Sequence, residues 1–150
     1  MGVKGKQGTL QGRGLTIGIV AARYNQPIVD ALVEGALKAL KQHGAKADPV
    51  LSVPGSYEIP IAAQALVDAG KVDAVICLGC VIKGETAHFE HIAEAAARGI
   101  LDVSLESGVP CIFAVLTTYT EQQARARLDK GKEAAETAIE MANLLKLVRK

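Results

Sequence analysis

The sequence is poor in aromatic residues and has almost no excess of either charge. Phe, Trp and Tyr make up 3% of its 150 residues, and the formal net charge at pH 7 is +1. Nucleic-acid surfaces are built from basic patches and stacking rings, so this composition argues against that class of protein. No apolar run reaches the roughly 18 residues of a membrane span, and residues 1–8 lack the apolar segment of a signal peptide. We therefore expect a soluble, cytoplasmic protein without nucleic-acid or membrane partners.

Cysteine is scarce too, and its three residues suggest neither a disulfide framework nor a redox pair. Cys77 and Cys80 form a C-x-x-C pattern inside an apolar run that is typical of a strand. Residues three apart in a strand point to opposite faces and lie about 10 Å apart, which no disulfide can close. Residues 88–90, His-Phe-Glu, imitate the H-x-E part of the zinc-deaminase signature. In that signature a C-x-x-C pattern follows the H-x-E, whereas in this chain the C-x-x-C pattern precedes it. We expect reduced thiols and no metal ion.

The residues that are present have the composition of a globular protein. Apolar residues make up 49% of the chain and charged residues 22%, near the average for soluble domains. A chain of this length usually forms one domain and buries roughly 70% of the surface that its unfolded form exposes. We expect a single domain over residues 1–150, in which the glycine-rich segment 1–13 is an extended arm that lies on another surface.

Short apolar runs alternate with segments of helical periodicity. We expect strands at residues 15–21, 49–53, 74–81 and 111–116, and helices at 27–43, 58–69, 87–107, 122–127 and 132–147. Strands that alternate with helices indicate parallel pairing, and short apolar strands in such a sheet are usually covered on both faces. The sequence therefore predicts an α/β fold with one parallel sheet between layers of helices.

Functional side chains follow the expected strands at residues 23–27, 54–58, 81–88 and 117–118. Right-handed crossovers place the carboxyl ends of all parallel strands on the same edge of the sheet. Ligands of open α/β sheets bind at that edge. We therefore expect one pocket that draws on all of these segments.

The segment 83–88 carries the clearest chemical signal. Gly84, Glu85 and Thr86 stand where a helix begins, and the free N–H groups of its first turn favour an anion such as phosphate. Lys83 adds a full positive charge nearby. We expect Thr86 to cap the helix through its hydroxyl, and His88 in the first turn to carry a proton near neutral pH. The segment therefore predicts an anion site beside a proton-transfer group.

Simpler explanations stay open for other residues at this edge. Tyr24 and Tyr57 each follow a strand, and they either stack on a flat ligand or cover the end of the sheet as ordinary loop residues. Glu58 stands at a helix start, where the helix dipole alone favours a carboxylate. His91 is expected to be a helix-surface or packing residue.

Four segments together resemble the 6,7-dimethyl-8-ribityllumazine synthase family: GIVAARYN at 18–25, VPGSYEIP at 53–60, GCVIKGETAHFE at 79–90 and AIEMANL at 138–144. The resemblance covers nearly the whole chain. It implies a flavodoxin-like three-layer sandwich around a four-stranded parallel sheet. It also implies a transferase of riboflavin biosynthesis, which condenses 5-amino-6-(D-ribitylamino)uracil with 3,4-dihydroxy-2-butanone 4-phosphate and uses neither cofactor nor metal. Such subunits form homopentamers with active sites between neighbours, and some assemble further into decamers or larger shells.

The resemblance also implies roles for individual residues. His88 resembles the proton-transfer residue, and Arg127 the phosphate-binding residue that we count as catalytic. The implied substrate-binding residues are Tyr24 and Asn25 at the pyrimidine, Ser56, Tyr57 and Glu58 at the ribityl chain, Val81, Ile82 and Lys83 at the heterocycle, and Gly84, Glu85 and Thr86 at the phosphate. Phe113 and Lys130 look like contributions of the adjacent subunit.

The chain departs from the family pattern in two places. Family members usually carry a segment like AGTKAGNKG after the arginine, whereas this chain continues from Arg127 with LDKGKEAA, which we interpret as a shorter connection. Tyr119 stands where an acidic residue is common. A shorter connection must present a different surface to a neighbouring pentamer, so we expect a pentamer or decamer in preference to a larger shell. The alternative function is a pentameric scaffold of the same fold with weak or no catalysis.

Overall fold

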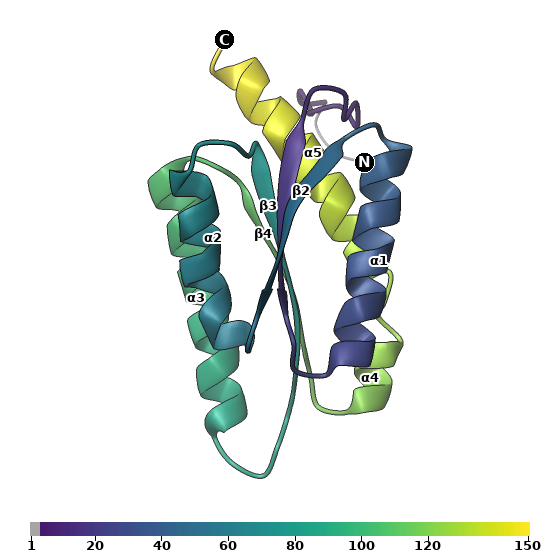
Figure 1. The fold of residues 1–150 in the computed structure, drawn as a ribbon, viewed down its shortest axis with the longest axis vertical. Helices are drawn as coiled ribbons and strands as arrows, with labels where there is room; N and C mark the ends of the chain where they lie inside the picture. Colours follow the sequence, from purple (N-terminus) through teal and green to yellow (C-terminus); the bar gives the residue numbers. More distant parts are fainter. Residues whose placement is uncertain (1–3) are drawn as a thin grey trace.

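The computed structural model describes residues 4–150, which form one sheet between two layers of helices (Figure 1). Most predicted elements are found and differ from the prediction at their ends. The elements are β1 (Thr16–Ala22), α1 (Gln26–Gln42), β2 (Lys46–Val53), the 3₁₀ turn η1 (Ser56–Glu58), α2 (Ile59–Asp68), β3 (Ala74–Ile82), α3 (His88–Ser107), β4 (Cys111–Thr118), α4 (Glu121–Arg125) and α5 (Lys130–Val148).

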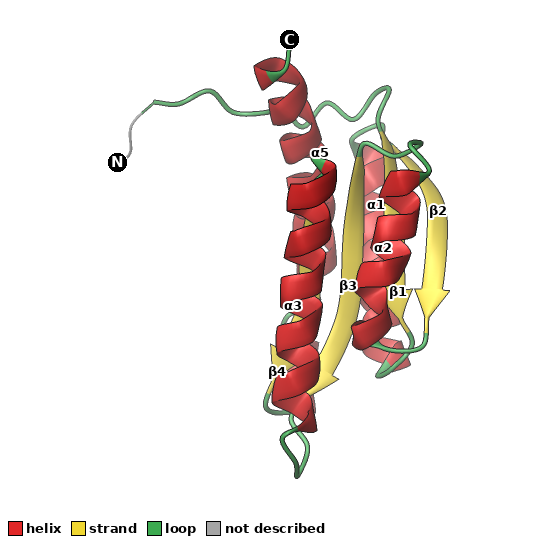
Figure 2. Ribbon diagram, turned by 90° about the vertical axis from the view of Figure 1, so that its left-hand side faces the viewer, coloured by secondary structure: helices red, strands yellow, loops and turns green. Residues whose placement is uncertain are grey.

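The four strands are parallel and lie in the order β2-β1-β3-β4. One face of the sheet packs against α1, α4 and α5, and the other against α2 and α3 (Figures 1 and 2). Each face has its own apolar cluster, because successive side chains of a strand point to opposite sides. This arrangement confirms the predicted α/β fold and is consistent with a flavodoxin-like sandwich.

β3 is an inner strand of this sheet, and its residues are buried from Ala74 to Cys80. Cys77 belongs to the cluster that faces α2 and α3, and Cys80 to the cluster that faces α1 and α5. The two thiols therefore lie on opposite faces, as their spacing predicts. All three cysteines are free.

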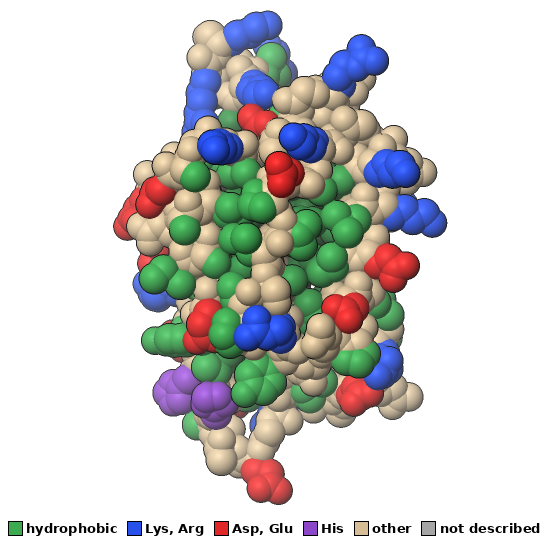
Figure 3. All heavy atoms as spheres, in the orientation of Figure 1, with side chains coloured by type: hydrophobic (Ala, Val, Ile, Leu, Met, Phe, Trp, Pro, Cys, Tyr) green, Lys and Arg blue, Asp and Glu red, His purple; other side chains and the backbone are tan. Residues whose placement is uncertain are grey.

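β2 differs most from its prediction. It begins at Lys46, ahead of the expected residue 49, and its side chains are not buried on both faces. Because β2 is an edge strand, alternate residues face solvent, and Val50 is 48% exposed. The register with β1 gains one residue between Ala47 and Val50, around Pro49, and edge strands tolerate proline at such a bulge. Figure 3 views the molecule from the side where the edge strand β2 lies, and it shows hydrophobic side chains gathered on that side.

The last helix begins earlier than predicted. The sequence suggested a break near residues 129–131, but α5 starts at Lys130 and contains Gly131 in its first turn. A side chain at Gly131 would overlap the carbonyl group of Leu32 on α1. The break between the last two helices lies at residues 126–129, slightly ahead of the predicted position, and Gly131 lets α5 approach the backbone of α1.

Residues 4–13 contain no helix or strand. The side-chain amide of Asn143 on α5 donates to the carbonyl oxygens of Thr9 and Gln11, each at 2.9 Å. The arm therefore lies partly on the last helix of its own chain, and Figure 2 shows its earlier residues leading away from the domain. Residues 1–3 of the predicted arm lie outside the described residues. No helix within residues 4–150 is long and apolar enough to cross a membrane.

Candidate active site

The order of the strands reverses between β1 and β3. The chain runs from β1 to β2 on one side and then crosses to β3 on the other. In open parallel sheets such a reversal leaves a crevice beyond the carboxyl ends of the two central strands, where ligands bind. Here β1 ends at Ala22 and β3 at Ile82. The predicted segment 23–27 follows the end of β1 directly, and the segment 81–88 begins with the last two residues of β3.

A cavity of about 550 Å³ opens at this edge. It combines residues that follow β1, residues around η1, and residues from the end of β3 and the start of α3. Eight predicted site residues share its lining, which consists of Tyr24, Asn25, Gly55, Ser56, Tyr57, Glu58, Cys80, Val81, Ile82, His88 and Ile92. Figure 3 shows histidine side chains at the end of the molecule where α3 begins.

The turn between β1 and α1 holds Tyr24 at the cavity. Asn25 has a left-handed backbone with φ of 57°, and its Nδ2 donates to the carbonyl oxygen of Cys80 at 2.9 Å. Its own carbonyl accepts from the N–H groups of Ile28 and Val29, which begins α1. Asn25 thus ties this turn to the end of β3. The neighbouring Tyr24 ring is 72% exposed and available for stacking on a ligand.

Residues 55–58 form another wall of the cavity. A Cβ atom on Gly55 would lie 3.2 Å from both Tyr24 Cδ2 and Glu58 Oε1, so the tyrosine ring and the carboxylate flank this glycine. Ser56 is buried, with 4% exposure, and packs over Gly79 of β3. Because residue 79 is glycine, the segment 55–58 can approach the sheet closely. The Glu58 carboxylate of this segment then faces the cavity.

The loop between β3 and α3 brings His88 to the cavity. Ala87 occupies the N-cap position with a helical backbone, and α3 begins at His88. Thr86 Oγ1 accepts from the backbone N–H of His88 at 3.3 Å. Thr86 therefore stabilises the turn before the helix, whereas the sequence predicted that it occupies the cap position itself. His88 and Ile92, four residues apart on the same helix face, both reach the cavity.

Seven predicted site residues lie outside the cavity lining: Lys83, Gly84, Glu85, Thr86, Phe113, Arg127 and Lys130. Residues 83–86 are exposed and join the end of β3 to α3. The Nη1 atom of Arg127 donates to the carbonyl oxygen of Gln123 at 2.8 Å, so its guanidinium group lies along α4. Phe113 is 39% exposed on the edge strand β4, and Lys130 is the first residue of α5. The roles of these residues stay predictions.

Three lining residues were missed by sequence reasoning. Ile92 could have been found, because it lies one helical turn after His88. Gly55 lies within the predicted segment 54–58 but was not named as a site residue, and its extended backbone with φ of −150° gives no sign of a special role. Cys80 was assigned to a buried strand, and no feature of the sequence shows that the strand end opens onto a cavity.

The cavity contains titratable groups suited to proton transfer and a thiol that is not reactive. Glu58 and His88 both line it, and a carboxylate and an imidazole are side chains that can donate and accept protons. Burial raises the pKa of the Cys80 thiol to about 11, and the Glu121 carboxylate adds to this effect. A protonated thiol is a poor nucleophile. Within residues 4–150, no three His, Cys, Asp or Glu side chains are grouped as metal ligands.

Comparisons with known proteins place the chain in a family. The model of the family described as 6,7-dimethyl-8-ribityllumazine synthase matches residues 14–146. The chain is also similar to a curated 6,7-dimethyl-8-ribityllumazine synthase of Thermococcus kodakarensis, with 44% identity over 153 residues, covering 99% of this chain and 98% of the relative. The family match includes every segment that lines the cavity. The chain therefore belongs to the 6,7-dimethyl-8-ribityllumazine synthase family.

Proposed function

We propose that this protein condenses 5-amino-6-(D-ribitylamino)uracil with 3,4-dihydroxy-2-butanone 4-phosphate in riboflavin biosynthesis. The products are 6,7-dimethyl-8-ribityllumazine, phosphate and water. The observation that carries the proposal is that Tyr24, Glu58 and His88 line one cavity at the reversal of strand order, in a chain of this family.

The geometry supports separate roles for the parts of the site, which bind the pyrimidine, the ribityl chain and the phosphate. The Tyr24 ring stacks on the flat pyrimidine, and Val81 and Ile82 at the end of β3 contact the edge of the heterocycle. Glu58 and its neighbours contact the ribityl hydroxyls. The phosphate lies before α3, where the first-turn N–H groups and the helix dipole attract an anion. This orientation brings the two reactants together beside His88, and proximity alone can lower the barrier of a bimolecular condensation substantially.

The chemistry needs proton transfers but no change of oxidation state. The pyrimidine amine attacks the ketone, and loss of water gives an imine. Removal of the C3 proton of the imine supplies the electron pair that expels phosphate from C4 as an anion, and the resulting enol tautomerises to a ketone at C3. The ribitylamino nitrogen attacks this ketone and closes the second ring with loss of another water. Protons move at the carbon chain as well as at nitrogen and oxygen, and we assign these transfers to His88 at the start of α3.

The direct test mixes both substrates with the purified protein. The lumazine product absorbs at longer wavelength than the substrates, and phosphate release can be measured in the same sample. We expect both signals to appear at the same rate and well above the uncatalysed reaction. A rate equal to the background reaction would instead favour a scaffold role for this fold.

The assembly that we propose is a homopentamer, or a decamer, in which neighbours complete each active site. Phe113 and Lys130 lie outside the cavity of their own subunit and are exposed, which suits residues that serve an adjacent one. Light scattering during size exclusion measures the size directly, and a monomer would contradict a shared site. Refolding a mixture of His88→Ala and Phe113→Ala subunits gives a second test, because only shared sites recover activity in the mixture.

A further inference from the structure

A single side chain contacts the residues on either side of the loop that leads to His88. The Nζ atom of Lys83, which precedes the loop 84–88, lies 5.5 Å from the centroid of the Tyr119 ring. Phe89, which follows it, has its ring centroid 6.2 Å from the same ring, with the two planes inclined at 40°. A cation over an aromatic face and a tilted aromatic pair are both attractive arrangements. Tyr119 therefore bridges the two ends of the loop.

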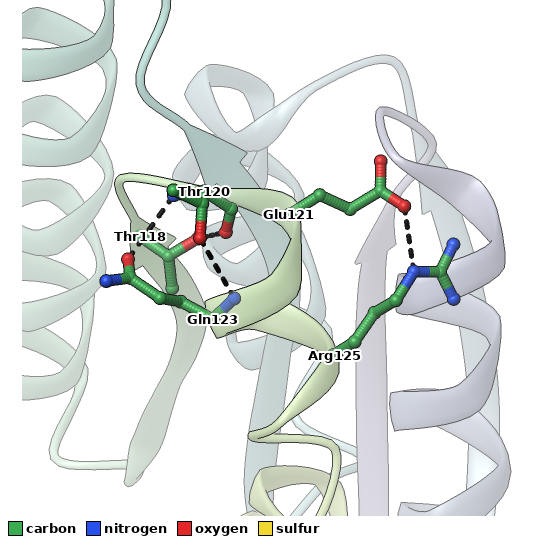
Figure 4. A network of polar contacts seen from close by, with 5 residues as sticks. All are labelled: Thr118, Thr120, Glu121, Gln123 and Arg125. Atoms are coloured by element: carbon green, nitrogen blue, oxygen red, sulfur yellow. Dashed lines mark hydrogen bonds and ion pairs between the residues drawn. The ribbon is translucent and has the colours of Figure 1, made fainter.

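Tyr119 is itself held by the turn between β4 and α4. Its backbone N–H donates to Oε1 of Gln123 at 2.8 Å, and the Thr120 hydroxyl caps α4 by accepting from the Gln123 N–H at 3.1 Å. Thr118 Oγ1 also donates to the Thr120 carbonyl oxygen at 2.9 Å (Figure 4). The ring thus projects from a turn that hydrogen bonds hold in one conformation.

The loop has little other support. Residues 83–88 are exposed, and a side chain on Gly84 would meet no atom within 4 Å. The bond from the backbone N–H of Lys83 to the Thr118 carbonyl oxygen, at 2.9 Å, fixes where the loop leaves β3. Beyond that point, the Tyr119 contacts restrain the side chain before the loop and the one after it.

We propose that Tyr119 is a positioning residue, which holds the loop 84–88 in the conformation that binds the phosphate of the four-carbon substrate. This inference rests on the proposed function. When a site must adopt one of several conformations to bind, its apparent affinity falls in proportion to the population of the competent one. Removing the ring spreads the loop over more conformations in the free protein. The phosphate substrate must then select the competent one.

The kinetic test compares Tyr119→Ala, Tyr119→Phe and Glu121→Gln with the unmodified chain. Loss of both aromatic contacts in Tyr119→Ala should raise KM for the butanone phosphate roughly five- to fiftyfold. The kcat value and KM for the pyrimidine should change less than about twofold. Tyr119→Phe keeps the ring and should retain the original KM. Glu121→Gln breaks the nearby ion pair with Arg125, leaves Tyr119 in place, and should have no effect.

Hydrogen exchange in the substrate-free protein tests the same inference without turnover. Amides of residues 84–88 should exchange faster in Tyr119→Ala and at the original rate in Tyr119→Phe. Equal exchange in all variants, or a KM increase shared by both substrates, would overturn the positioning role. An inactive unmodified protein would refute the proposed function, while faster exchange in Tyr119→Ala would then still establish that the ring holds the loop.

Discussion

Gly79 of β3 lies directly against Ser56 of the cavity wall, and a methyl group added to the glycine would come within 2.7 Å of the Ser56 Oγ atom. We expect Gly79→Ala to lower the free energy of unfolding by about 1–3 kcal/mol, as overpacking does elsewhere. The displaced segment should also raise KM for the pyrimidine. Urea unfolding at fixed protein concentration and steady-state kinetics measure the two effects. Adding Ser56→Gly removes the clash and should recover part of the stability; no recovery would contradict the contact.

Asn25 supports both the turn after β1 and the end of β3. Asn25→Ala loses the bond to the Cys80 carbonyl and forces a left-handed backbone on alanine, so we expect a loss of about 1–3 kcal/mol in unfolding free energy. Asn25→Gly loses the same bond but adopts the backbone freely, and should be less destabilised than the alanine variant. Equal losses in urea unfolding would mean that backbone strain contributes nothing at this position.

His88 is expected to carry protons during the condensation. His88→Ala should lower kcat by roughly ten- to a thousandfold, since general acid–base catalysis is typically worth 10²–10⁴ and proximity still assists the reaction. Calorimetry should show that a ribityl analogue binds with little change. His91→Ala is the matched control, because His91 is exposed on the same helix and does not line the cavity. Unchanged turnover in His88→Ala would remove His88 from the mechanism.

The guanidinium group of Arg127, which donates one hydrogen bond to the Gln123 carbonyl, is expected to bind the phosphate of the four-carbon substrate. We expect Arg127→Ala to raise KM for the butanone phosphate far more than KM for the pyrimidine, since an arginine–phosphate contact is charge-assisted and strong. Inorganic phosphate should compete with the former substrate and lose affinity in the variant. Arg125→Ala breaks an ion pair on α4 and should change neither KM. Similar increases for both substrates would place Arg127 away from the phosphate.

The buried thiols should make the free energy of unfolding depend on pH in the alkaline range. Burial raises the pKa values of Cys80 and Cys111 to about 11 from an ordinary value of 9.0, and raises the pKa of Cys77 still further. Between pH 9 and 11 the unfolded chain loses these protons while the folded chain keeps them, so the free energy of unfolding should fall as pH rises. Urea unfolding across this range should give a flatter profile for the Cys80→Ala, Cys111→Ala double variant. Identical slopes would contradict the shifts.

The sequence predicted strands best where local pattern and tertiary environment agree. β3 is buried on both faces, as its continuous apolar run predicted. β2 was predicted too short because edge pairing, and not apolar content, makes Lys46–Asp48 part of the strand. The start of α5 was predicted too late for a similar reason. Glycine residues end helices and also allow two helices to pack closely, and only the position of α1 shows that Gly131 does the latter.

The cavity followed from topology more than from composition. Once parallel strands are inferred, residues after β1 and β3 must meet, which is why Tyr24 and His88 share a lining. The directions of individual side chains could not be predicted in the same way. Nothing in the sequence indicates that the Arg127 guanidinium bonds to the Gln123 carbonyl of α4, or that Tyr119 lies between Lys83 and Phe89. These relationships depend on rotamers and on the exact angle at which α4 leaves the sheet.

The contact between Gly131 and the Leu32 carbonyl has a consequence for engineering this chain. Because backbone meets backbone there, the start of α5 is fixed against α1 and cannot slide along it to absorb extra residues. Residues inserted between Arg127 and Lys130 would have to loop outward into solvent, leaving the helix and the cavity in place. The turn at 127–129 is therefore a site where the connection could be lengthened and the effect on subunit assembly measured, with activity followed in the same variant because Arg127 and Lys130 flank the insertion.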